Sequence, residues 1–121
     1  MPVTGIGGFF FRAQDPKTLA AWYLKHLGVG APEGQYLWDQ QAGPTVFSPF
    51  PQTSDYFAAD KGWMLNLRVE GLDDLLTSLR TAGIDVITKD EWDATPEIGR
   101  FARIHDPEGN PIELWEPPVK A

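Results

Sequence analysis

The stretch that most constrains this chain is the segment 104–117, IHDPEGNPIELWEP, in which a turn signature separates two short runs. Pro107 fixes φ at the first central position of a tight turn, and the Asp106 side chain can accept hydrogen bonds from the backbone that follows it. Gly109 can adopt the left-handed conformation that such a turn requires. The segment therefore predicts a β-hairpin.

The second run of this hairpin alternates in polarity. Ile112 and Leu114 fall on one face of a strand, and Glu113 and Trp115 fall on the other, because successive side chains of a strand point to opposite faces. The hairpin thus presents a carboxylate on the face away from its apolar contacts. Whether Glu113 does chemistry there is the central question that the sequence raises.

Composition limits the classes of protein to which the chain can belong. Its 121 residues fit a single domain, 1–121, and its net charge of −7 with a pI near 4.6 argues against nucleic acid or an anionic membrane as a partner. The absence of cysteine excludes disulfides and thiolate chemistry. With no signal-peptide pattern and no run of membrane-spanning length, we expect a soluble, cytoplasmic protein.

The first half predicts a strand that leads into a helix. Residues 6–13 carry the aromatic run of the strand, and the helix is expected over 16–27. Asp15 is a good N-cap for this helix, and Gly28 is a natural left-handed stop. Two further short strands are predicted at 36–38 and 45–47.

The second half repeats this order. A strand is expected over 63–69, and a leucine stripe from Leu72 predicts a helix that ends at Gly83. The remaining strands are predicted at 86–88 and 100–105, before the last strand of the hairpin.

The two halves form an internal repeat. Strand passes into helix after Arg12 and again after Arg68, 56 positions later, and glycine stops follow at similar distances. Two βαβββ modules in tandem, at 1–57 and 63–118, are the most economical interpretation, because each half-sheet needs the other to complete a core. The fold class predicted is α+β.

The sequence resembles the vicinal oxygen chelate superfamily, which includes glyoxalase I, extradiol dioxygenases and the bleomycin and fosfomycin resistance proteins. The match is most specific at 106–114, DPEGNPIEL, which is similar to the family's D-P-x-G-x-x-I-E-L signature. The segment 11–15, FRAQD, and the later pairs Trp22–Tyr23 and Leu27–Gly28 are similar to its first strand and helix. The resemblance implies a glyoxalase/bleomycin-resistance fold, with a curved mixed sheet and helices on its outer face. Residues 29–35 leave room for only a short second strand.

The resemblance also implies metal-ligand positions, most of which this chain does not fill. Gly8 has no side chain, Met64 is a soft thioether, and the closing strand of the first half offers only hydroxyls. Glu113 alone matches a ligand position. Of the two histidines, His26 belongs to the first helix and only His105 could approach the cleft, so we expect no metal and no cofactor.

Alternation places a set of side chains on the ligand-facing side of the sheet. The predicted pocket is aromatic with a few polar groups, as is usual for a small-molecule site. Its members are Phe10, Arg12, Met64, Asn66, Phe101, Arg103, His105, Glu113 and Trp115.

These residues have alternative interpretations. Glu113 could act as a general base, or could simply pair with Arg103 or Asn66. Arg12 and Arg68 could form strand-end salt bridges or bind an anion. Trp115 and Trp63 could stack on a planar ligand, or could fill the core or a subunit interface. Trp92 could lie on a loop that covers the cleft, or could be exposed at a contact with another chain. The same two alternatives apply to the segment 55–57.

Three hypotheses follow. The leading one is a metal-independent protein that binds a small aromatic or planar organic molecule, in the manner of sequestering or resistance proteins. The second is an enzyme related to lyases or dioxygenases, with Glu113 as base or as ligand of an unusual metal site. The third is a structural or regulatory dimer module whose cleft is vestigial. We expect the chain to form a homodimer.

Overall fold

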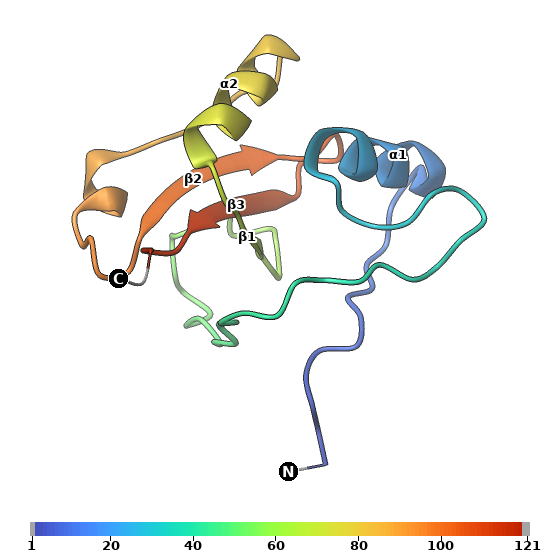
Figure 1. Ribbon diagram of the computed structural model, residues 1–121, viewed down its shortest axis with the longest axis horizontal. Helices are drawn as coiled ribbons and strands as arrows, with labels where there is room; N and C mark the ends of the chain where they lie inside the picture. The colour runs from blue at the N-terminus through green and yellow to red at the C-terminus, as the bar shows by residue number, and fades with distance from the viewer. Residues whose placement is uncertain (1, 120–121) are drawn as a thin grey trace.

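The computed structural model describes residues 2–119, which form two α-helices, a short 3-10 helix and a three-stranded sheet (Figure 1). The elements, in chain order, are α1 (Pro16–Leu27), β1 (Leu65–Arg68), α2 (Leu72–Thr81), η1 (Asp90–Asp93), β2 (Arg100–His105) and β3 (Pro111–Glu116). No helix within these residues is long and apolar enough to span a membrane.

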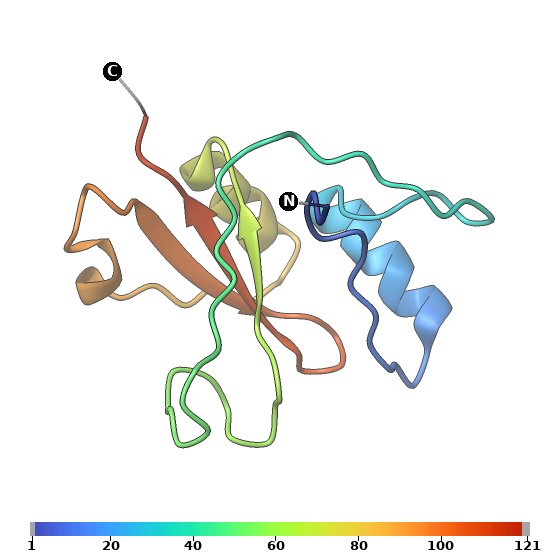
Figure 2. The same cartoon turned by 90° about the horizontal axis from the view of Figure 1, so that it is seen from below.

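The sheet is mixed, with β3 at its centre. Its order is β1-β3-β2, and β3 pairs in parallel with β1 and antiparallel with β2. Helix α2 lies over one face, whereas the connector between α1 and β1 crosses the opposite face (Figures 1 and 2). The predicted α+β class is therefore confirmed, and the hairpin of 104–117 is the β2–β3 hairpin.

Alternation along the strands builds the core on the helical side. The central strand buries Ile112 and Leu114 completely, and β2 buries Ala102 and Ile104 in the same way. Burying a leucine or isoleucine side chain contributes roughly 1.5–3 kcal/mol, so these positions hold the sheet to the helices. The helices supply the rest of the buried cluster: Leu19, Tyr23, Leu72, Leu76 and Leu79.

The hairpin turn also fixes α1. Asp106 is 4% exposed, and its Oδ1 accepts hydrogen bonds from the backbone N–H groups of Glu108 (2.9 Å) and Asn110 (3.0 Å). Its Oδ2 accepts from the Tyr23 hydroxyl (2.7 Å) and from Asn110 Nδ2 (2.8 Å). Glu108 in turn accepts from the backbone N–H groups of Gln14 and Asp15 at the start of α1. The turn is thus a docking point for a helix far away in sequence.

The caps predicted for α1 are present. Asp15 accepts a hydrogen bond from the Thr18 backbone N–H (3.2 Å), and Gly28 ends the helix at φ 66°. Helix α2 runs two residues beyond the leucine stripe, to Thr81, and Gly83 follows at φ 80°.

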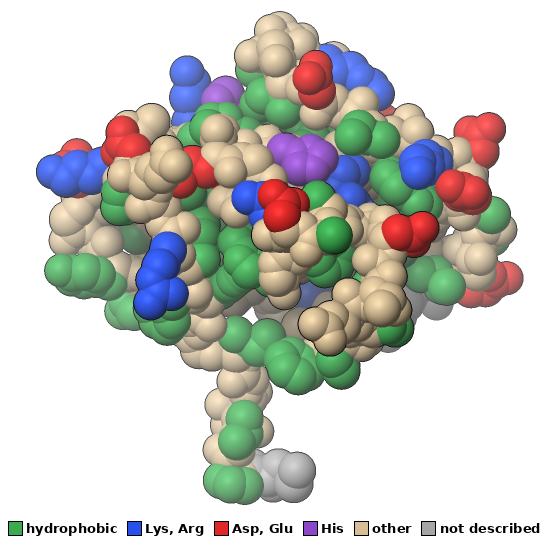
Figure 3. Space-filling view, turned by 180° about the vertical axis from the view of Figure 1, so that it is seen from behind, with side chains coloured by type: hydrophobic (Ala, Val, Ile, Leu, Met, Phe, Trp, Pro, Cys, Tyr) green, Lys and Arg blue, Asp and Glu red, His purple; other side chains and the backbone are tan. Residues whose placement is uncertain are grey.

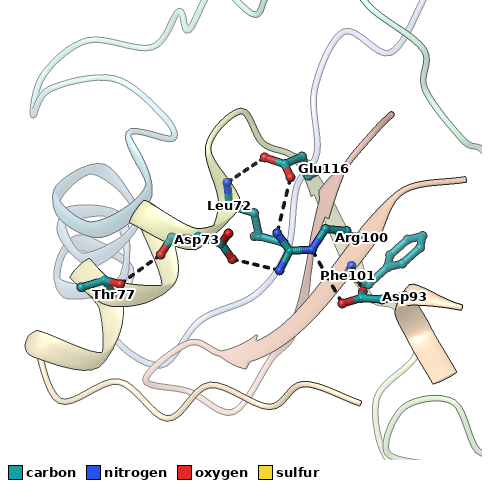
Figure 4. A network of polar contacts seen from close by, with 7 residues as sticks. All are labelled: Leu72, Asp73, Thr77, Asp93, Arg100, Phe101 and Glu116. Atoms are coloured by element: carbon teal, nitrogen blue, oxygen red, sulfur yellow. Dashed lines mark hydrogen bonds and ion pairs between the residues drawn. The ribbon is translucent and has the colours of Figure 1, made fainter. Parts of the chain in front are cut away.

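Arg100, the first residue of β2, ties four elements together (Figure 4). Its guanidinium lies 2.9 Å from Asp73 Oδ1, 3.7 Å from Asp93 Oδ2 and 3.8 Å from Glu116 Oε1. Glu116 Oε2 also accepts a hydrogen bond from the Leu72 backbone N–H (2.8 Å). The start of α2, η1 and the ends of β2 and β3 are therefore held at one corner.

Several predicted strands are not formed. Within the described residues, the segments 6–13, 36–38 and 45–47 are extended or irregular backbone without strand pairing. Glycines before and within the first segment and prolines around the third disfavour a continuous ladder. The strand predicted at 86–88 is reduced to one bridge, in which Ile87 and Arg103 exchange hydrogen bonds of 2.9 and 2.8 Å.

The second half comes closest to the predicted module. It contains β1, α2, the bridge at Ile87, β2 and β3, although β1 covers 65–68 where 63–69 was expected. The limits of the two modules, 1–57 and 63–118, stay a prediction.

Candidate functional site

Three polar side chains stand side by side across the sheet. Asn66 on β1 pairs with Glu113 on β3, and Glu113 pairs with Arg103 on β2. Because their neighbours along each strand enter the core, these three residues belong to the face opposite the helices. We refer to Asn66, Glu113 and Arg103 as the polar row.

Glu113, at the centre of the row, is 7% exposed and has donors on both carboxylate oxygens. Its Oε1 accepts a hydrogen bond from Asn66 Nδ2 (2.8 Å), and its Oε2 accepts from the hydroxyl of Tyr56. Tyr56 comes from the connector between α1 and β1, 57 positions away. A buried carboxylate is stabilised by such donors, so Tyr56 and Asn66 hold Glu113 in a fixed orientation.

Arg103 is 6% exposed and lies between aromatic rings. Its Cζ is 5.0 Å from the centroid of the Tyr56 ring and 5.5 Å from that of Trp92, which are cation–π distances. Nη2 donates to the Tyr56 carbonyl oxygen (3.2 Å). The buried Nε has no hydrogen-bond partner among the described residues. Arg103 is therefore an incompletely satisfied cation under an aromatic cover.

A second row follows one step along the same face. Arg68, Trp115 and Phe101 are in register on β1, β3 and β2. The rings of Phe101 and Trp115 are nearly parallel, at 8°, with centroids 6.4 Å apart. The indole Nε1 donates to the Ile98 carbonyl oxygen (2.8 Å), which fixes the plane of the ring. The two rings are stacked on each other and form an aromatic pair beside the polar row.

Arg68 attaches the connector to the end of β1. Its Nη1 donates to the Pro44 carbonyl oxygen (2.6 Å), and its Nη2 donates to that of Gln41 (2.7 Å). A groove of about 1190 Å³ lies between this part of the connector and the ends of β1 and β3. Asn66, Arg68 and Trp115 line the groove, whereas Glu113 and Arg103 lie outside its lining.

Burial and charge shift two titrations at this face. Burial, together with the hydrogen bond to Glu113, raises the pKa of Tyr56 to about 12, so the phenol stays protonated and donates to the carboxylate. Burial, and next the nearby Arg103 cation, lowers the pKa of His105. The lowered pKa favours the neutral form of the His105 imidazole.

A family model for the glyoxalase-like domain matches residues 8–115. The chain belongs to the glyoxalase-like domain family. The superfamily resemblance read from the hairpin is thereby confirmed, because the match contains the whole of the DPEGNPIEL signature. No curated protein sequence matches the chain significantly.

Solved structures show the same fold for this glyoxalase-like protein. TnmS3, an antibiotic binding protein from Streptomyces sp. CB03234, is 24% identical with a TM-score of 0.59, over 97% of this chain and 98% of that one. Lactoylglutathione lyase from Agrobacterium tumefaciens is 20% identical with a TM-score of 0.61, over 96% of each chain. A putative glyoxalase family protein from Bacillus anthracis is 22% identical with a TM-score of 0.52, over 84% and 83%.

The donors at the polar row do not fit the metal site that the superfamily resemblance implies. Both oxygens of Glu113 are already bonded to Tyr56 and Asn66, and Met64, just before β1, offers only a thioether. In the chain from residue 2 to 119, no three His, Cys, Asp or Glu side chains are grouped so that they could hold a metal ion.

The structure brings together most of the side chains predicted for the pocket and separates others from it. Asn66, Arg103 and Glu113 meet in the polar row, with Phe101 and Trp115 beside them. Met64 is half-buried beside β1, and His105 is exposed at the far end of β2. Phe10 is 94% exposed and Arg12 is also exposed, because the strand expected to carry them is not formed.

Two residues outside the predicted set complete the site. Tyr56 and Trp92 cover Arg103, and their ring centroids are 6.2 Å apart. Sequence reasoning identified both only as aromatic residues of loops that could cover the cleft. The partners that they contact are distant in sequence, so no spacing rule could have assigned them.

Proposed function

We propose that this glyoxalase-like protein binds a small aromatic or planar organic molecule on the polar row without the help of a metal ion. Asn66, Glu113 and Arg103 orient the ligand through hydrogen bonds, and the stacked Phe101–Trp115 pair provides apolar contacts beside them. A few polar groups set among aromatic side chains are the usual composition of a small-molecule site.

The observation that carries this proposal is the state of Arg103. The guanidinium is 6% exposed, has no carboxylate within ion-pair distance among the described residues, and leaves Nε without a partner. A buried donor without a partner costs folding free energy. A ligand that supplies an acceptor would recover that cost.

Metal independence is supported by the donor set. Glu113 is the only carboxylate in the polar row, and its neighbours are an amide and a guanidinium. A guanidinium beside the carboxylate repels a divalent cation and has no lone pair to offer it.

The structural neighbours are consistent with more than one use of the fold. TnmS3 is described as an antibiotic binding protein, which agrees with a binding function, whereas another neighbour is a lyase. At identities below 25% they support the fold alone, so the choice between binder and enzyme depends on the side chains.

The test is isothermal titration of the chelator-treated protein against a panel of neutral, cationic and anionic aromatic compounds. We expect at least one compound to bind, and Arg103→Met to weaken it about tenfold or more, since a hydrogen bond to a charged group is lost. Arg80→Met, on the exposed side of α2, is the matched control and should bind like wild type. No binding across the panel, or binding that requires added divalent metal, would overturn the proposal.

A second candidate function is acid–base catalysis by Glu113. The hydrogen bond between its carboxylate and the Tyr56 phenol favours it, because such a pair can pass a proton to or from a substrate. If a reaction is found, Glu113→Gln should abolish turnover and retain binding. Turnover that survives this substitution would exclude Glu113 as the base.

We also propose that the protein acts as a homodimer. Large apolar side chains are exposed along the N-terminal segment and the connector, among them Phe10 and Phe47 at 94% and 86%. Figure 3 shows hydrophobic side chains on the surface along the N-terminal extension and at its base. Exposed apolar surface of this kind marks interaction sites.

A further inference from the structure

The Tyr56 side chain lies over Glu113 and Arg103 of the polar row. We refer to the space that it occupies there as the slot. The Tyr56 hydroxyl donates to Glu113 Oε2, and its ring lies 5.0 Å from the guanidinium carbon of Arg103. The ring also contacts two aromatic neighbours, with centroids 5.7 Å from Phe50 and 6.2 Å from Trp92. The slot thus offers a carboxylate acceptor, a cation over a ring face and aromatic walls, which together recognise a hydroxylated aromatic ring.

Tyr56 leaves one hydrogen-bond donor of the slot, Arg103 Nε, without a partner in the described part of the chain. Arg103 Nε is buried and has no acceptor among the described residues, although the side chain around it is otherwise packed. A donor left in this state favours any occupant that brings an additional oxygen acceptor. An external phenol that carries a carbonyl or carboxylate oxygen could therefore accept the hydrogen bond of Arg103 Nε that Tyr56 leaves unmade.

The segment that carries Tyr56 is attached in a way that allows it to leave. In the described structure, the other hydrogen bonds of residues 50–61 are short-range: Ser54 N–H to the Pro51 carbonyl, Tyr56 N–H to Ser54 Oγ, and Lys61 N–H to the Ala58 carbonyl. Tyr56 itself makes the bonds to the sheet, through its hydroxyl to Glu113 and its carbonyl to Arg103. Releasing one residue would open the slot without breaking a strand or helix.

We propose that the ligand of this protein is a phenolic compound with a second oxygen acceptor, and that it binds by displacing Tyr56 from Glu113 and Arg103. The proposal rests on the proposed function and narrows its ligand class. The ligand hydroxyl takes the place of the Tyr56 hydroxyl on Glu113, its ring lies against the Arg103 guanidinium, and its acceptor receives the hydrogen bond of Nε.

The test uses the ortho, meta and para isomers of hydroxyacetophenone as probes, with phenol and acetophenone as matched compounds that each lack one group. Binding to the full chain is measured by isothermal titration. We expect at least one isomer to bind about tenfold or more tightly than either phenol or acetophenone, since each of these lacks one hydrogen bond to a charged side chain.

Removing the internal competitor should strengthen binding. In Tyr56→Ala the slot is vacant, so the best isomer should bind about tenfold or more tightly than to wild type, and Tyr56→Phe, which lacks only the hydroxyl, should fall between them. Tyr36→Ala, at a tyrosine that is 93% exposed, should leave affinity unchanged. Circular dichroism melts establish that each variant is folded, and Tyr56→Phe carries the test if Tyr56→Ala is not.

The outcomes separate this inference from the proposed function. If acetophenone binds as well as every hydroxylated isomer, or if neither Tyr56 variant binds more tightly than wild type, phenol recognition by displacement is wrong while aromatic binding stands. If no aromatic probe binds wild type or either Tyr56 variant in an Arg103-dependent manner, the proposed function itself is wrong.

Discussion

At the scale of single residues, Asp106 connects the signature turn to the rest of the molecule. It accepts two backbone hydrogen bonds within the turn and two side-chain hydrogen bonds, one of them from Tyr23 on α1. A buried carboxylate with this many donors cannot be removed without leaving several of them unpaired. The aspartate of the signature therefore serves the stability of the turn and its contact with α1, whereas Glu113 of the same signature belongs to the site.

We predict that Asp106→Ala lowers the free energy of unfolding by about 2–4 kcal/mol, because it removes the acceptor of four hydrogen bonds in a buried turn. Tyr23→Phe removes one of these bonds and should cost about 1–2 kcal/mol. Asp39→Ala, at an exposed position of the connector, is the control and should lie within about 0.5 kcal/mol of wild type. Urea denaturation measures all three. An Asp106→Ala variant as stable as the control would contradict this role.

The residues of the site differ in how well they could be predicted. Strand alternation predicts the face of the sheet on which Asn66, Arg103 and Glu113 lie. This pattern depends only on neighbouring positions in one strand, so the partner strand need not be known. The contact of Tyr56 with Glu113 joins residues 57 positions apart, one of them in irregular backbone. Periodicity cannot specify where such a segment passes, so the sequence indicates aromatic residues that could cover the cleft but not which side chains they contact.

At the scale of elements, strands form here where hydrogen-bonding partners exist. The central strand β3 has neighbours on both sides, and β2 is joined to it by a tight turn, so both match their predicted positions within the hairpin. The segment 6–13 has the aromatic content of a strand but no paired neighbour within the described residues. Strand propensity largely reflects packing against neighbours, so composition alone overestimated the first half.

The backbone of β3 approaches closely at Gly99, the residue before β2. Gly99 has φ 120°, and a Cβ built there would lie 2.2 Å from the Glu116 carbonyl oxygen of β3. We predict that Gly99→Ala destabilises the protein by at least about 2 kcal/mol, because it combines a strained conformation with a backbone clash. Thermal and urea unfolding measure the effect.

Gly62→Ala is the matched control for this prediction. A Cβ at Gly62 would meet nothing within 4 Å, and φ there is not in the left-handed region, so its effect should lie within about 0.5 kcal/mol of zero or be slightly stabilising. Equal effects of the two substitutions would show that the corner tolerates a side chain.

At the scale of the whole molecule, the chain has two surfaces of different character. The buried cluster lies between the sheet and the helices, whereas the N-terminal segment and the connector between α1 and β1 leave most of the exposed large apolar side chains in water. Strand β1 is also an edge strand, with a neighbour on one side only among the described strands. An unpaired edge beside exposed apolar segments is a template for association with another chain.

These features predict that a second copy of the chain covers the exposed segments, in a symmetric pair. Sedimentation equilibrium should give twice the chain mass of 13.5 kDa for wild type.

Phe10→Asp and Phe47→Asp place charge on side chains that are 94% and 86% exposed, so they should weaken the dimer about tenfold or more while leaving the buried cluster intact. Ser78→Asp, exposed on α2, should remain dimeric. A wild-type protein that is monomeric at every concentration, or Phe variants that associate like Ser78→Asp, would show that these apolar side chains serve no interface between copies.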